Sequence, residues 1–252
     1  MKYSCGKRSC KNRSANSPPA ADTVPGTAWS LPELERKIPA KLLDRPAYIY
    51  VVTTAELLPN GAFNQTGSAP NFNGGRITLC TCKHKDRSSP PPQNCRGPNP
   101  QDPWQDVWVG GICSATVLRP RALFYLMLIE KTYANHQIIW SALGGPKAKS
   151  AYRNPIGDIY EPLASAASNP WSQNSYQPRL STHVHAKNAR THDIEQSFYR
   201  PARHPRLFLG DKRRSHLWSS PTITLQPSAD RDWKTAHHRF YEHLSDFLAI
   251  LQ

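Results

Sequence analysis

Cysteine and histidine residues are the side chains with the widest chemical range in this sequence of 252 residues. Cys80 and Cys82 are separated by one residue, and Lys83 and His84 follow them. A neighbouring positive charge lowers the pKa of a thiol, so Cys82 is a candidate nucleophile. On a strand, however, Lys83 lies on the opposite face from Cys82. Zinc-binding cysteine pairs have two or more intervening residues, so small buried side chains are the simpler role for these thiols.

A second group of candidate ligands contains His183, His185 and His192, with Asp193 beside the last of them. Three imidazoles could gather around a metal ion, but a loop rich in Arg, Ser, Thr and His produces the same pattern by chance. We therefore expect no metal and no cofactor. If the chain is an enzyme that acts on a nucleotide or nucleobase, then Cys82 or this histidine group carries the chemistry.

Nucleotide-binding and hydrolase motifs are absent from the sequence. The glycine pairs at residues 74–75, 110–111 and 144–145 fit neither GxGxxG nor GxxxxGK[ST], and no GxSxG elbow occurs. A nucleotide-phosphate loop of either type and a GxSxG nucleophile elbow are therefore not expected.

The charge balance favours a polyanionic partner. The chain has 32 Lys and Arg against 18 Asp and Glu, a formal net charge of +14. The densest basic stretch covers residues 200–214 and includes Arg206, Arg213 and Arg214. A positive field of this kind attracts nucleic acid without reading its sequence. We expect these three arginines, together with Lys83, to contact phosphates.

The sequence also limits where the protein acts. No apolar run approaches the roughly 20 residues that a membrane span needs, so no membrane partner is expected. The first residues lack the apolar core of a secretory signal. The expected location is therefore intracellular, cytoplasmic or nuclear and not secreted, with reduced cysteines.

Three regions are expected along the chain. Residues 1–44 are predicted to be a disordered basic arm with one short helical turn at 31–37, and residues 45–227 form the domain. Residues 228–252 are the third region, in which an amphipathic stripe at residues 230–252 predicts a C-terminal helix. This helix is expected to pack on the domain, although it could instead bind a partner protein.

Alternating and apolar segments predict the elements of the domain. Strands are expected at residues 48–54, 76–83, 106–112, 121–130, 157–160 and 206–210. A short helix is expected within residues 132–143 and ends at Gly144. Because long βα units are absent, we expect an α+β fold with a small, mostly antiparallel, curled or barrel-like sheet and peripheral helices.

The order of several motifs resembles the nucleotide modification associated domain 2 family over about residues 47–226. The matching segments are YVV at 50–52, ITLCTCK at 77–83, DVWVGG at 106–111, FYLMLIE at 124–130, GDIY at 157–160 and RLFLG at 206–210. Three departures are Gln105 in place of a glycine, His84 in place of a proline, and an apparent insertion at residues 85–103.

This resemblance implies a role beside systems that modify nucleic-acid bases, and a fold similar to the small PUA-like and EVE-like barrels that read modified bases. It implies a module that binds DNA or RNA and accepts a flipped base. The pocket would have Trp108 and Tyr160 as its aromatic walls, and Asp106 and Asp158 as acceptors at the base edge.

Overall fold

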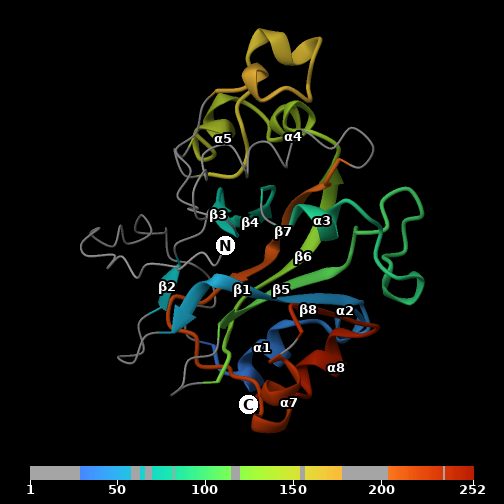
Figure 1. Ribbon diagram of the computed structural model, residues 1–252, viewed down its shortest axis with the longest axis vertical. Coiled ribbons are helices and arrows are strands. Elements are labelled where there is room, and N and C mark those ends of the chain that lie inside the picture. The colour runs from blue at the N-terminus through green and yellow to red at the C-terminus, as the bar shows by residue number, and fades with distance from the viewer. Residues whose placement is uncertain are drawn as a thin grey trace, which may run out of the picture.

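The architecture is an open mixed sheet of eight strands with helices packed on one of its faces (Figure 1). Seven strands follow the order β2-β1-β5-β6-β7-β4-β3, and β8 pairs with β1 beside β2. This computed structural model describes residues 29–57, 63–65, 70–81, 83–114, 120–153, 157–177, 204–234 and 236–252.

The elements have the following bounds. The strands are β1 (Ala47–Leu57), β2 (Phe63–Gln65), β3 (Asn71–Asn73), β4 (Arg76–Leu79), β5 (Trp108–Ser114), β6 (Leu123–Tyr133), β7 (Leu207–Leu217) and β8 (His238–Tyr241). The helices are α1 (Leu31–Lys37), α2 (Ala40–Leu43), α3 (His84–Arg87), α4 (His136–Ala142), α5 (Pro146–Ser150), α7 (Pro227–Asp232) and α8 (Leu244–Leu248). Short 3-10 turns are η1 (Gln93–Cys95), η2 (Ala164–Ala167) and η3 (Gln173–Ser175).

The α+β class and the mostly antiparallel sheet are confirmed. β1 and β5 run parallel, and the other strand pairings are antiparallel. A closed barrel is wrong, because the described strands end at β3 on one side and at β2 and β8 on the other. β2 and β3 have three residues each, too few for the continuous ladder that closure requires.

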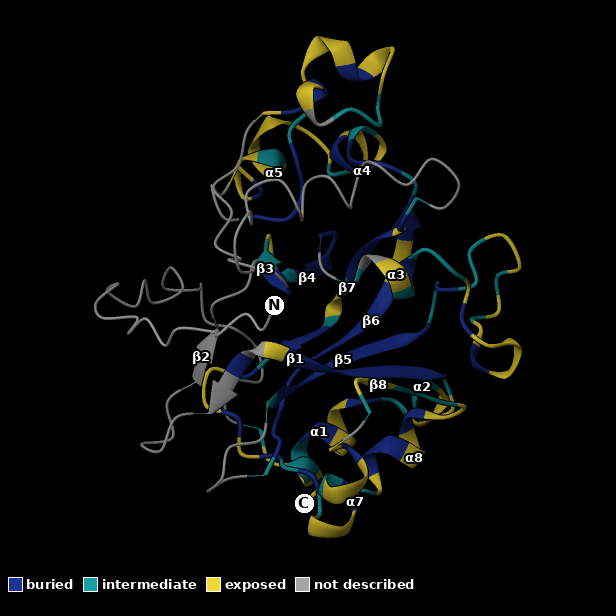
Figure 2. Cartoon of the chain, viewed as in Figure 1, coloured by how far each residue is buried: buried dark blue, intermediate teal, exposed yellow. Residues whose placement is uncertain are grey.

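Strand alternation creates two cores, one on each face of the sheet. Along β1, Ile49 and Val51 point to one face, while Tyr48 and Tyr50 point to the other. The first face packs against α1, α2, α7 and α8, which lie together below the sheet in Figure 1, and we call it the helical-side core. The second face lies inside the curl of the sheet, and we call it the curled-side core. Figure 2 shows that the central strands are buried along most of their length.

The predicted helix at residues 31–37 is confirmed as α1. The Ser30 amide and hydroxyl both donate to the Glu33 carboxylate at 2.8 Å, which gives the helix a capping box. Leu34 and Ile38 are buried in the helical-side core. The boundary of the arm at residue 44 is therefore wrong, since residues 31–43 hold two helices of the fold. Residues 1–28 lie outside the described part of the chain.

The single helix predicted for residues 230–252 is wrong, although its apolar stripe is buried. The stretch divides into α7, β8 and α8, and the His237 carbonyl accepts a hydrogen bond of 2.9 Å from the Val51 amide. Trp233, Phe247 and Leu251 still pack into the helical-side core. Pairing with the edge of β1 overrides the helical periodicity here, because a free strand edge offers backbone partners that a helix does not use.

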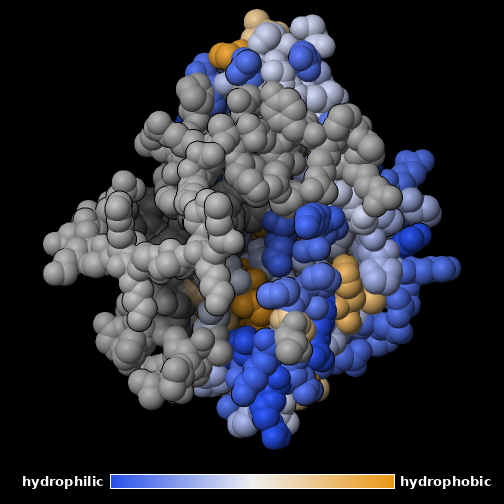
Figure 3. Space-filling model, viewed as in Figure 1, coloured by the Kyte–Doolittle hydropathy of each residue, from blue (hydrophilic) through white to orange (hydrophobic). Residues whose placement is uncertain are grey.

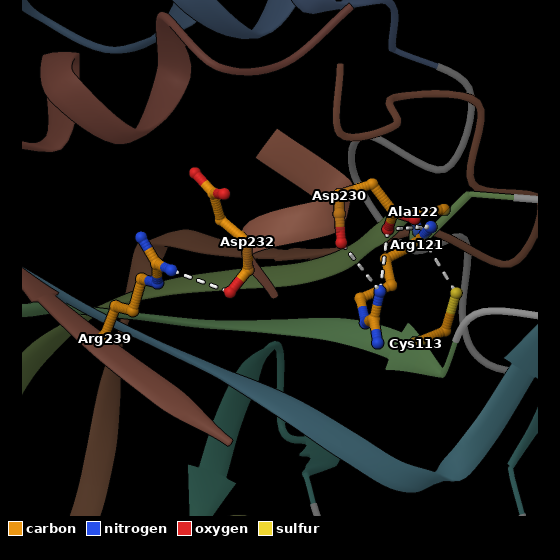
Figure 4. A network of polar contacts seen from close by, with 6 residues as sticks. All are labelled: Cys113, Arg121, Ala122, Asp230, Asp232 and Arg239. Carbon is orange, nitrogen blue, oxygen red and sulfur yellow. Dashed lines mark hydrogen bonds and ion pairs between the residues drawn. The ribbon is translucent and has the colours of Figure 1, made fainter. Parts of the chain in front are cut away.

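An ion pair fixes α7 to the start of β6. The Arg121 guanidinium donates to the Asp230 carboxylate at 2.8 Å, and the Arg121 amide donates to the same oxygen at 3.2 Å (Figure 4). Nearby, Arg239 of β8 donates to the Asp232 carbonyl oxygen at 2.8 Å. The C-terminal segment is thus a docked part of the domain.

Most of the other predicted elements are confirmed, with shifted ends. β1, β5, β6 and β7 cover the predicted strands, and α4 ends before Gly144, whose φ is 93°. The strand predicted at 76–83 stops at Leu79, and residues 157–160 form a bend instead of a strand.

Truncation of Leu34 tests the place of α1 in the fold. The side chain is fully buried, so Leu34→Ala should lower the free energy of unfolding by about 3 kcal/mol, through lost transfer energy and a cavity. Urea unfolding of the full chain measures this loss. Glu35→Ala alters an exposed neighbour and should change stability by less than about 0.5 kcal/mol. Equal, small effects of both changes would show that α1 does not belong to the cooperative unit.

Candidate nucleic-acid interface

The basic stretch at residues 200–214 ends in a large bulge of β7. Gly210 pairs with Ile129 of β6, and Ser215 pairs with Met127. Residues 211–214 therefore stand opposite a single residue of β6 and loop out of the ladder. An ordinary bulge adds one residue to a strand, whereas this bulge displaces four side chains from the sheet.

Hydrogen bonds and a narrow neck define the shape of this bulge. The Arg213 amide donates to the Asp211 carboxylate at 2.7 Å, and the Ser215 hydroxyl donates to the Asp211 carbonyl oxygen at 2.8 Å. A Cβ atom on Gly210 would lie 2.6 Å from the Ser215 hydroxyl oxygen and 2.8 Å from the Ile77 carbonyl oxygen. Only glycine permits this approach, so the two sides of the neck stay close together.

The bulge presents three consecutive cations, Lys212, Arg213 and Arg214. The first two are exposed and the third is half-buried. None of them forms an ion pair with a carboxylate of the described residues, and the Asp211 carboxylate is occupied by a backbone amide. Burial, and to a smaller extent the positive charge of Arg214, lowers the pKa of His216 to about 4.

The turn between β3 and β4 lies beside the bulge. Gly74 and Gly75 have φ values of 60° and 78°, which a two-residue hairpin turn requires. A Cβ atom on Gly75 would lie 2.9 Å from Lys212 Cε, so the lysine stem packs across the turn. Arg76, which follows the turn, is paired with Glu130 at 2.6 Å. The uncompensated charge of this region therefore comes from the bulge.

Lys83 lies away from the bulge and has partners of its own. Its ammonium is 4.7 Å from the centre of the Tyr50 ring and 3.9 Å from the Asp86 carboxylate. Asp86 also accepts a 2.6 Å hydrogen bond from the Tyr48 hydroxyl, whose pKa is raised well above its usual value by burial and by this carboxylate. These contacts join the segment after β4 to β1. The predicted phosphate contact of Lys83 stays a prediction.

Arg206 lies just before β7 and is separated in sequence from the bulge by the first half of that strand. Its side chain is exposed, while its amide donates to the Arg87 carbonyl oxygen at 3.0 Å. The buried Arg87 guanidinium donates to the Arg206 carbonyl oxygen in return. Of the arginines predicted to bind phosphate, Arg213 and Arg214 are brought together on the bulge.

Trp108 is a core residue. It is fully buried in the helical-side core, and its indole Nε1 donates to the Leu42 carbonyl oxygen of α2 at 2.8 Å. The preceding Asp106 has φ of 61°, and its amide donates to the Ile129 carbonyl oxygen at 2.9 Å. The residue with left-handed backbone in this turn is therefore Asp106, and aspartate is one of the residue types that tolerate it. The turn can form without a glycine at position 105.

Asp158 is buried and holds its segment against β4. Its two carboxylate oxygens accept from the Thr78 hydroxyl at 2.6 Å and from the Cys80 amide at 2.7 Å. Burial raises the pKa of Asp158 to about 6, and these two hydrogen bonds oppose the rise. With only 1% of its surface exposed, the carboxyl group acts as a structural acceptor.

Tyr160 lies in a small buried cluster that is separate from both main cores. Its ring packs edge-on against His136 with 4.8 Å between ring centres, and its amide donates to His136 Nδ1 at 3.2 Å. Tyr160, Trp108 and Asp158 therefore have different packing and hydrogen-bond partners. The contacts with a base that the resemblance implies for these three residues and for Asp106 stay predictions. The structure shows that the three have packing or hydrogen-bonding roles within the domain.

The residues proposed for enzyme chemistry are Cys82, His183, His185 and His192, and they lie outside the described residues. Cys80 is described, and burial raises the pKa of its thiol well above the usual value, which disfavours the reactive thiolate. Within the described ranges, no group of three or more His, Cys, Asp or Glu residues is arranged to hold a metal ion.

The described surface is mainly polar. Figure 3 shows hydrophilic residues over much of the visible described face, with smaller apolar areas between them. Among described large apolar side chains, Ile138 and Leu163 are the exposed ones. No helix in the described ranges has the length and apolar character needed to cross a membrane.

No protein-family model matches this chain, and no curated protein or solved structure does so either. The family resemblance therefore rests on the motifs themselves. Five of these motifs overlap strands β1, β4, β5, β6 and β7, each of which contributes side chains to the curled-side core.

The titration of Asp158 gives a test of its buried position. Its folded-state pKa of about 6 exceeds the unfolded value of about 3.9, so the folded protein holds a proton through this window that the unfolded chain releases. The contribution of this group to stability therefore falls as pH rises from about 4 to about 6. Relative to Asp158→Asn, which does not titrate, the native chain should lose about 3 kcal/mol over this range.

Urea unfolding at a series of pH values measures this difference. Asp232→Asn is the matched control, since Asp232 is exposed and forms no ion pair with a described cation. The control should follow the pH dependence of the native chain. If Asp158→Asn also did so, the carboxyl group would not be buried as described.

Proposed function

We propose that this chain is a nucleic-acid-binding module that contacts the phosphate backbone through the β7 bulge. The observation that carries the proposal is the row of three cations on residues 212–214, displaced from the sheet and without a carboxylate partner among the described residues. Such a row costs free energy by self-repulsion unless an anion meets it.

The side-chain types favour phosphate over other anions. Arg213 and Arg214 present planar guanidinium groups, which match two oxygens of one phosphate, and Lys212 adds a point charge. The overall charge of +14 extends the attraction beyond the bulge. Contacts of this kind set affinity and orientation but do not read sequence.

The resemblance to the nucleotide modification associated domain 2 family supports the same class of ligand. It also suggests a PUA-like fold and recognition of a modified base within a base-modification system. These finer assignments are part of the proposal, and they are tested separately from backbone binding, because Trp108 and Asp158 have structural roles that do not depend on a ligand.

Loss of the two bulge arginines should weaken binding and its salt dependence. Each phosphate contact contributes about 0.7 to 0.9 to the slope of log K against log salt. Arg213→Ala with Arg214→Ala should therefore lower the slope by about 1.4 to 1.8. Fluorescence anisotropy of the full chain with labelled DNA and RNA oligonucleotides, over a salt series, measures this slope.

The matched control is Arg231→Ala with Lys234→Ala, which removes two exposed charges from the helical side of the domain. It should leave most of the slope in place. Equal losses in both double variants would contradict a localised interface. Oligonucleotides with and without a modified base test the finer assignment, and equal affinity for both would remove base recognition while keeping backbone binding.

A further inference from the structure

A second group of cations lies on α5, a short helix above the sheet (Figure 1). Lys147 is exposed, and Lys149 is half-buried with its ammonium 6.0 Å from the centre of the Trp140 ring. The next cation, Arg153, is paired with Glu161 at 2.7 Å, so its charge is compensated. Lys147 and Lys149 form no ion pair with a described carboxylate.

The β3–β4 turn links this helix to the bulge. A Cβ atom on Gly74 would lie 2.8 Å from the Tyr152 hydroxyl oxygen, and one on Gly75 would lie 2.9 Å from Lys212 Cε. Tyr152 is the second residue after α5, and its amide donates to the Lys149 carbonyl oxygen at 2.9 Å. The two adjacent glycines therefore contact the bulge through Lys212 and the segment after α5 through Tyr152.

We propose that the bulge, the β3–β4 turn and α5 form one continuous track for a single strand of DNA or RNA. This inference rests on the proposed function and deepens it, since it names the form of the nucleic acid and a second contact region. The turn has no side chains of its own at Gly74 and Gly75, and the Lys212 stem that packs across it belongs to the bulge end of the track. A flexible single strand can follow a path over three separate elements, whereas a duplex is stiff over about 150 base pairs.

Strand length and lysine removal together test the track. Lys147→Ala with Lys149→Ala should lower the salt slope by about 1.4 for a thymidine oligonucleotide of roughly 16 nucleotides, because each single-strand phosphate contact contributes about 0.7. The same variant should bind a strand of roughly 4 nucleotides as the native chain does, since the bulge alone can hold it. Arg213→Ala with Arg214→Ala should weaken both.

The control is Lys41→Ala with Lys234→Ala, which removes two exposed lysines from α2 and the segment after α7. It should not reproduce the length-dependent loss. Thermal unfolding followed by circular dichroism shows whether each variant folds. Uridine oligonucleotides of the same lengths form the RNA arm, and the track predicts the same length dependence for them.

The outcomes separate the two proposals. If the α5 variant bound the long strand as tightly as the native chain while the bulge variant did not, the track would be wrong and the bulge interface would stand. If neither variant lost affinity, both proposals would fail. If the native chain bound a duplex of the same length as tightly as the single strand, the assignment to single strands would be overturned.

Discussion

Burial of β1 on both faces is the constraint on which the rest of the structure depends. Tyr48 and Tyr50 fill one core, while Ile49 and Val51 fill the other. A strand in this position needs a packed layer on each side and backbone partners on each edge. β5 pairs along one edge, and β8 and β2 share the other. The helices cover one face, and the curl through β7 and β4 covers the opposite one.

In this arrangement the charged residues fall into two groups, those that are buried or paired and those that project outward. Asp86 and Lys83 lie where the chain leaves β4, and their contacts with Tyr48 and Tyr50 join the curled part of the sheet to β1. Asp158 is desolvated and held by donors from β4. Charges needed for packing are thus compensated or buried, whereas those of residues 212–214 are displaced outward. The contrast between the two kinds of site supports a role in ligand binding for the second kind.

Sequence patterns predicted the helices and strands that form because of their own local sequence. The β-branched and aromatic residues at 48–54 and the helix-start residues Ser30 and Pro32 before and within 31–37 both predicted the observed elements. The stripe at 230–252 indicated burial correctly but not the secondary structure, because the free edge of β1 is a distant feature. The burial of Trp108 depends on α2, which the pattern of residues 1–44 did not suggest. The charge of residues 206–214 was visible, but its projection from the sheet depends on the register with β6.

The bulge also has a consequence for how the protein can change over evolutionary time. Its neck at Gly210 and Ser215 fixes the register of β7, while residues 212–214 contribute little to either core. Substitution or lengthening between these two positions can therefore alter the proposed phosphate-binding surface without a matching loss of stability. Sites that bind ligands often trade stability for activity. If the bulge binds phosphate as proposed, the two properties lie on different residues of the same strand, and recognition can diversify on a constant scaffold.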